Sequence, residues 1–197
     1  MEPISVKTIG KYKIKVMVDD SPFDPRDDDN LGTMVCFHNS YILGDKHNYS
    51  SGDYQGWDEM KEAIIKNENV CVILPLFLYD HSGITMNTTG FHCPWDSGQV
   101  GWVFISKEKI RDEFSKKRIS KQLIEKVTKL LKSEVETYDH YLTGSAYGYC
   151  ITDTETGEEA DSCWGFLGDS DYCELEAVKM AEALVELDKD NQLKFEM

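Results

Sequence analysis

Residues 74–106 read LPLFLYDHSGITMNTTGFHCPWDSGQVGWVFIS, and the two apolar runs at the ends of this stretch decide the fold. The first run belongs to residues 70–79, the most apolar segment of the chain, and the second is residues 99–105. Short apolar runs rich in branched and aromatic residues predict buried strands. Pro75 indicates a bulge or a sheet edge, because proline has no N–H to donate to a neighbouring strand. We therefore expect both runs to lie in one sheet, which closes the polar loop between them.

Periodicity outside this stretch predicts further strands and helices. The predicted strands are residues 12–18, 33–38, 146–153 and 158–166, the last two paired as a hairpin across TETGE. The predicted helices are residues 57–67, 120–142 and about 171–187, with a helical turn at 106–114. Strands mostly precede helices in this order. The order favours an α+β fold, with a mixed or mostly antiparallel sheet and about three helices packed on it.

The length of 197 residues suits a single α+β domain over residues 1–197. Residues 144–197 form a candidate acidic subregion of a hairpin and a helix. No run of about 18 apolar residues predicts a membrane helix, and the N-terminal sequence MEPISVKTIGKYK lacks the apolar run of a signal peptide. We expect a soluble, intracellular protein. Its six cysteines are scattered without a CxxC pair, and we expect them to be reduced because a chain without an export signal stays in a reducing compartment.

The formal net charge of −15 is unevenly distributed along the chain. Residues 19–29 contain six aspartates against one arginine, and residues 134–197 contain 17 acidic residues against 3 basic ones. Residues 107–132, in contrast, contain 10 basic and 4 acidic residues. Binding of duplex nucleic acid through the whole surface is disfavoured, because phosphate contacts need a basic face. An acidic surface instead suits a basic partner, which includes the nucleic-acid channel of another protein.

The polar loop inside the opening stretch contains the residue types of a hydrolase. A cysteine nucleophile needs a nearby base, so Cys93 with His81 or Asp96 is the enzymatic candidate, and Asp80 completes this set. His92 is a poor partner for Cys93, because adjacent residues do not normally face each other. None of these residues lies in a diagnostic catalytic motif.

The same loop also offers ligands for a metal ion. Asp80, His81, His92 and Asp96 provide nitrogen and oxygen atoms of the kind that zinc and other transition metals accept. No HExxH, HxH or CxxC spacing fixes a geometry. The sequence therefore predicts no cofactor, and a divalent metal stays an alternative with its ligands unknown.

A purely structural interpretation of the loop stands beside these two. Its Asp and Ser side chains would bind backbone groups of the loop, and Trp95 and Phe91 would insert into the core. The basic residues of 107–132 would then be a solvated helix face, with contact to a partner or to nucleic acid as the alternative.

Four segments carry a resemblance to a known family. They are Asp29–His38 (DNLGTMVCFH), Tyr79–Thr85 (YDHSGIT), Cys93–Gly101 (CPWDSGQVG) and Asp161–Phe166 (DSCWGF). Together they resemble a family of small acidic counter-defence proteins of phages and mobile elements, among them a type II-A anti-CRISPR that blocks Cas9. The resemblance extends over residues 12–180 and carries no set of catalytic residues.

The resemblance implies a non-enzymatic inhibitor of a host CRISPR or other defence nuclease, located in the cytoplasm of the host cell. A Cas9-type nuclease holds nucleic acid in positively charged channels, so an acidic protein can occupy them as a phosphate mimic. The candidate partner-binding carboxylates are Asp24, Asp27, Asp28, Asp29, Glu155, Glu158, Glu159 and Asp161. The candidate contacts to guide RNA or DNA are Lys116, Lys117, Arg118 and Lys121. The alternatives are a metal- or cysteine-dependent hydrolase that uses the loop 80–97, and an interaction or assembly module of a phage.

Overall fold

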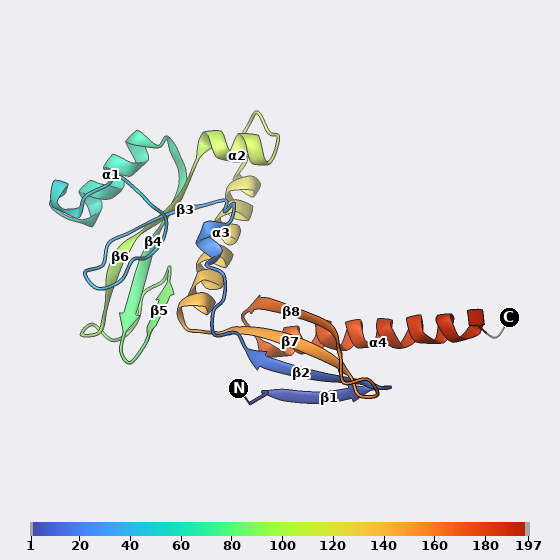
Figure 1. Ribbon diagram of the computed structural model, residues 1–197. Coiled ribbons are helices and arrows are strands. Elements are labelled where there is room, and N and C mark those ends of the chain that lie inside the picture. The colour runs from blue at the N-terminus through green and yellow to red at the C-terminus, as the bar shows by residue number, and fades with distance from the viewer. Residues whose placement is uncertain (1, 196–197) are drawn as a thin grey trace. The chain divides into compact units, whose positions relative to one another are not determined.

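The computed structural model describes residues 2–195, with side chains to residue 190. This part of the chain contains four helices and eight strands, and all strand pairs are antiparallel. The strands form two four-stranded sheets (Figure 1). The predicted α+β fold is therefore confirmed, with one helix more than the three expected. No helix among the described residues has the length and apolar character that crossing a membrane requires.

The chain forms two compact units. The central unit is Asp24–Thr143, and the terminal unit joins Met1–Phe23 to Gly144–Met197. The single domain expected from the sequence stays a prediction, as does a subregion confined to residues 144–197. In the structure these residues share their unit with the first strands of the chain.

The sheet of the central unit has the order β3-β6-β4-β5. Its strands are β3 (Thr33–Cys36), β4 (Val70–Asp80), β5 (Ile84–Asn87) and β6 (Ser97–Ser106). The two apolar runs pair with each other as β4 and β6, as predicted. Pro75 is tolerated in β4 because β5 pairs only with Phe77 to Asp80, so that Pro75 faces no strand on that side. The register of the β4–β6 ladder also shifts between Leu76 and Phe77.

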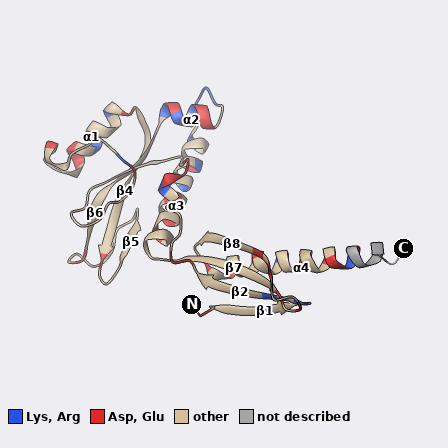
Figure 2. Ribbon diagram, in the orientation of Figure 1, with Lys and Arg blue, Asp and Glu red and all other residues tan. Residues whose placement is uncertain are grey.

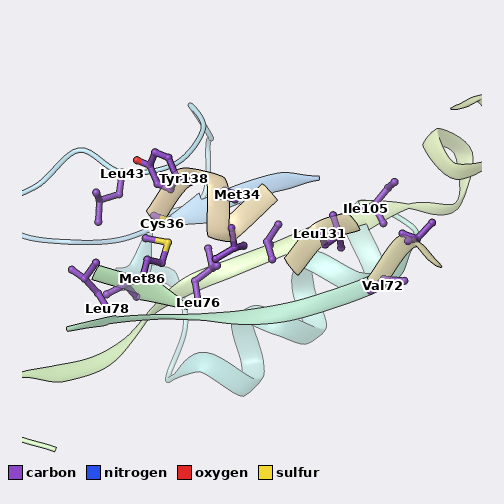
Figure 3. Close-up of a cluster of buried hydrophobic side chains, with 14 of the residues drawn as sticks. Met34, Cys36, Leu43, Val72, Leu76, Leu78, Met86, Ile105, Leu131 and Tyr138 are labelled. Carbon is purple, nitrogen blue, oxygen red and sulfur yellow. The ribbon is translucent and has the colours of Figure 1, made fainter. Parts of the chain in front are cut away.

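Helices cover both faces of this sheet. Helix α1 (Trp57–Asn67) buries Met60 and Ile64 against Val35, Trp102 and Phe104 on one face. Helices α2 (Lys107–Glu113) and α3 (Lys121–Leu142) pack on the other face. Figure 3 shows the second cluster, in which side chains from alternate positions of the strands meet those of α3. The residues drawn and labelled there are Met34, Cys36, Leu43, Val72, Leu76, Leu78, Met86, Ile105, Leu131 and Tyr138.

The ends of α3 lie where the sequence predicts them. Ser120 accepts a hydrogen bond from the backbone N–H of Leu123 at 3.2 Å and so caps the first turn. After the C-cap residue Thr143, Gly144 has a φ of 72°, a conformation that glycine adopts without steric cost. Between these ends, Val127, Leu131, Val135 and Tyr138 are buried at helical spacing.

The sheet of the terminal unit has the order β1-β2-β7-β8. Its elements are β1 (Ser5–Ile9), β2 (Tyr12–Val18), β7 (Ala146–Asp153), β8 (Glu159–Leu167) and helix α4 (Ser170–Phe195). The predicted hairpin of β7 and β8 is confirmed. Helix α4 packs on one sheet face through Cys173, Ala177 and Ala181, whose small side chains allow a close approach.

An ionic network joins α4 to the sheet. The ammonium group of Lys11 lies 3.0 Å from a carboxylate oxygen of Asp153 and 2.9 Å from one of Asp188. The hydroxyl of Tyr12 donates to Asp188 at 2.8 Å. Hydrogen bonds from the Glu155 backbone and Lys11 lower the pKa of Asp153, and bonds from Lys11 and Tyr12 lower that of Asp188. The same bonds raise the pKa of Lys11.

Candidate functional site

The loop 80–97 is held closed at the end of the β4–β6 ladder. The last pair of that ladder is Tyr79 with Ser97, and the backbone N–H of Asp80 donates to the carbonyl of Asp96 at 2.8 Å. The hydroxyl of Ser97 donates to the carbonyl of Cys93. Asp80 and Asp96 are therefore cross-strand neighbours, which place their side chains on the same face of the sheet.

Three of the four candidate catalytic residues meet at one carboxylate. The same oxygen of Asp96 lies 3.5 Å from Nδ1 of His81 and 3.5 Å from Sγ of Cys93. The histidine and the thiol are joined through the carboxylate and not to each other. A cysteine nucleophile needs its base in direct contact, with the carboxylate behind that base, so this order differs from that of a nucleophile–base pair.

The carboxylate of the fourth candidate, Asp80, forms no hydrogen bond or ion pair with these three side chains in the described structure. Its carboxylate instead accepts a hydrogen bond from the hydroxyl of Tyr41 at 3.4 Å. His92, considered as a metal ligand, is exposed. Among the described side chains, no group of three or more His, Cys, Asp or Glu residues is close enough to hold a metal ion.

The side chain of Trp95 is exposed where burial was predicted. The expectation that Trp95 inserts into the core is wrong, because its side chain is 91% exposed. Phe91 is half-buried, and its ring centroid lies 5.7 Å from that of Tyr79. The sequence shows that both residues are large and aromatic, but the direction of a loop side chain depends on contacts that the sequence does not reveal. The loop therefore presents a large aromatic surface beside two carboxylates.

A pocket of about 360 Å³ opens beside Trp95. Its lining includes His38, Leu78, Asp80, Trp95, Asp96 and Gly98. The ring of His38 stacks on that of Tyr41 with centroids 4.9 Å apart, and the next residue, Ile42, is fully exposed. Sequence reasoning did not single out Tyr41 or Ile42. The only available signal was the length of the loop that carries them, which is rich in Tyr, Ser, Gly and Asp.

The acidic loop after residue 23 separates into bonded and free carboxylates. Asp24 caps the short 3-10 helix at Pro25–Asp27 by accepting the backbone N–H of Arg26 at 2.8 Å. Asp27, Asp28 and Asp29 are exposed, and their carboxylates have no partner among the described residues.

The loop is fastened by a buried guanidinium group. Arg26, whose side chain is 4% exposed, donates two hydrogen bonds of 2.8 Å to the carboxylate of Asp45. The carboxylate of Glu134, on α3, accepts the backbone N–H groups of Leu31 at 2.6 Å and Gly32 at 2.9 Å. Asp28 and Asp29 line a pocket of about 470 Å³ together with Glu113 and Glu134. The free carboxylates thus lie on an anchored loop beside further acidic groups.

The carboxylates of the acidic hairpin in the terminal unit also include some with hydrogen-bond partners and some without. Glu155 and Glu158 are exposed at the turn, and their carboxylates have no partner in the described part of the chain. Glu159 accepts hydrogen bonds from Cys150 at 3.2 Å and Ser162 at 2.8 Å, which lower its pKa. Asp161 accepts one from the hydroxyl of Tyr149 at 2.9 Å. Glu159 and Asp161 are therefore partly engaged within the hairpin.

The four candidate nucleic-acid contacts lie together in the chain at the connection between α2 and α3. Lys116, Lys117, Arg118 and Lys121 are all exposed. Figure 2 shows Lys and Arg at α2 and at this connection. The structure thus leaves these four cations accessible to an anionic partner.

Comparison with known proteins provides no relative for this chain. No family model matches it, and neither curated proteins nor solved structures gave a match.

Proposed function

We propose that the protein is a phage-encoded, non-enzymatic inhibitor of a host defence nuclease of the Cas9 type, and that it acts in the cytoplasm of the host cell. It binds the nuclease through acidic surfaces that take the place of nucleic-acid phosphates. The observation that carries the proposal is a set of exposed carboxylates that have no partner among the residues the structure describes. They are Asp27, Asp28 and Asp29 in the central unit and Glu155 and Glu158 in the terminal unit.

Free carboxylates suit this role because their hydrogen-bonding capacity is still available to a partner. An arginine guanidinium binds a carboxylate through two parallel hydrogen bonds, and such charge-assisted bonds are among the stronger polar contacts. Arginine and lysine are the residues with which nucleases hold phosphates. The four segments that resemble phage counter-defence proteins support the choice of a Cas9-type target.

The basic connection before α3 extends the proposal to the nucleic acid of the complex. Lys116, Lys117, Arg118 and Lys121 would contact the guide RNA or the DNA while the carboxylates contact the protein. This contact would make the affinity for guide-loaded nuclease higher than that for nuclease without its guide.

Charge reversal tests the acidic interface directly. We expect the triple variant Asp27→Lys, Asp28→Lys, Asp29→Lys, or the double variant Glu155→Lys, Glu158→Lys, to weaken binding to guide-loaded Cas9 by about tenfold or more. The matched control is Glu182→Lys with Glu186→Lys, which reverses two exposed carboxylates of α4. Affinity is measured by biolayer interferometry at low salt, with a restriction endonuclease as the unrelated partner. Unchanged binding by both variant sets would contradict the proposal.

A further inference from the structure

The pocket beside Trp95 has an aromatic wall and an acidic wall. Leu78 and Asp80 line it from β4, and Asp96 and Gly98 from the opposing segment, since ladder neighbours in antiparallel strands share a face. A Cβ atom added to Gly98 would meet nothing within 4 Å. Gly98 thus leaves open space at the lining of the pocket, which Asp80, Asp96 and Trp95 also line.

Each of the two carboxylates keeps one oxygen free of any partner in the described structure. Asp80 uses Oδ1 for the Tyr41 hydroxyl, and Asp96 uses Oδ2 for His81 and Cys93. This leaves Oδ2 of Asp80 and Oδ1 of Asp96. Among the described residues, no lysine or arginine lines the pocket.

We propose that this pocket receives an arginine side chain of a partner protein. Asp80 and Asp96 accept hydrogen bonds from the guanidinium group, and the indole of Trp95 stacks on its plane. Arginine is the side chain that combines a permanent positive charge with a flat face, so it matches both walls at once. An exposed tryptophan beside a pocket is also typical of the residues that dominate protein–protein binding energies.

The identity of the partner rests on the proposed function, whereas the chemistry of the pocket does not. A nuclease channel rich in arginine is one source of the side chain. Because the pocket lies apart in the chain from Asp27, Asp28 and Asp29, it would add a second contact to that of the acidic loop.

The test uses the full-length, ¹⁵N-labelled protein and three blocked pentapeptides, acetyl-Gly-Gly-X-Gly-Gly-amide, in which X is arginine, lysine or citrulline. Chemical shifts are followed at low salt, and the indole N–H signal of Trp95 is assigned by its loss in Trp95→Phe. We expect the arginine peptide to shift this signal at the lowest concentration. The lysine peptide should need a higher concentration for the same shift. Citrulline, which keeps the flat group without the charge, should produce no saturable shift.

Two variants separate the acidic wall from the space above Gly98. The double variant Asp80→Asn, Asp96→Asn should weaken binding of the arginine peptide by about tenfold or more, because charge-assisted bonds are lost. Gly98→Leu should weaken this binding to the same extent by filling the pocket, without changing any charge. The control is Asp53→Asn, which neutralises an exposed carboxylate elsewhere in the central unit. The dispersion of the remaining amide signals verifies that each variant is folded.

Three results would overturn the pocket inference. The arginine and lysine peptides could bind with equal affinity, or the variants could bind the arginine peptide as tightly as the unmodified protein does. A single-stranded oligonucleotide, and not the arginine peptide, could shift the Trp95 signal. The same variants in the Cas9 binding assay separate the two proposals. Arginine-peptide binding without nuclease binding would contradict the proposed function but would still support the inference that the pocket binds arginine. Nuclease binding that is indifferent to Gly98→Leu, with no arginine-peptide binding, would contradict the pocket alone.

Discussion

The groups around a carboxylate in this protein decide whether it is bound within the fold or available to a partner. Glu134 and Asp29 are both acidic residues, but Glu134 is occupied by two backbone N–H groups and lies 3.7 Å from the buried guanidinium of Arg26. Asp29 has no partner among the described residues. The sequence indicates where negative charge is concentrated. It does not indicate which charges are free, because the partners of Glu134 lie more than 100 residues away in the chain.

The role of Glu134 can be tested by truncation. We expect Glu134→Ala to lower the free energy of unfolding of the central unit by about 2–4 kcal/mol, because two backbone N–H groups lose their charged acceptor and the buried Arg26 loses a nearby negative charge. Glu136→Ala, two residues on and exposed, serves as the matched control and should change it by less than about 0.5 kcal/mol. Urea denaturation followed by circular dichroism gives both values. Equal losses in the two variants would contradict this role.

At the scale of elements, periodicity predicted the parts that have a regular buried face. Helix α3 and the β7–β8 hairpin were predicted because their apolar spacing and glycine positions are local properties. Strands β1 and β5 were missed. Strand β5 has only four residues, and β1 exposes most of its side chains, so neither shows a strong pattern. Their places depend on pairing with β4 and β2.

Two adjacent leucines of α3 allow the energetic cost of a truncation in the core to be compared with that of one at the surface. Leu131 is fully buried in the cluster of Figure 3, whereas Leu130 is 37% exposed. We expect Leu131→Ala to cost about 2–5 kcal/mol of unfolding free energy through lost burial and a residual cavity. Leu130→Ala should cost less than about 1 kcal/mol. Thermal and urea denaturation of both variants test this difference, and similar costs would show that α3 is not packed as described.

The network that ties α4 to its sheet predicts a dependence of stability on pH. The native pKa values of Asp153 and Asp188 lie below their ordinary value of 3.8, so the unfolded chain binds protons first as the pH falls. Their contribution is complete above about pH 5 and is lost as the pH falls through the lowered native values. In Lys11→Met this acid dependence should be shallower. Lys13→Met, which removes an exposed lysine two residues further on in β2, should retain it.

Trp164 reports on this unit, because residues 1–23 and 144–197 contain no other tryptophan. The urea midpoint is measured between pH 6 and pH 2 from the ¹⁹F signal of 5-fluorotryptophan at this position. Parallel curves for Lys11→Met and the unmodified protein would contradict the role assigned to the network.

At the scale of the whole molecule, the fold class was predictable but the arrangement in two sheets was not. Strand β2 pairs with β7, more than 120 residues later, and no local pattern records this pairing. The loop 80–97 was recognised as distinctive from its composition alone. Composition does not indicate that the Asp96 carboxylate lies between His81 and Cys93, or that Trp95 is exposed to solvent.

Charge also differs between the two units. The terminal unit contains 17 acidic and 7 basic residues, and the central unit contains 19 and 14. Both units carry free carboxylates, so an inhibitor that mimics phosphates can use either or both.

We propose that the protein inhibits a Cas9-type nuclease by binding and not by catalysis. The most direct test titrates the protein against guide-loaded Cas9 and measures DNA cleavage after short and long preincubation, at low and high salt. We predict that inhibition reaches completion near equimolar amounts, does not grow with preincubation time after binding equilibrium, and weakens at high salt. Inhibition by far less than equimolar protein that increases with time would indicate an enzyme. Undiminished DNA cleavage at a large excess of the protein would show that it does not inhibit Cas9.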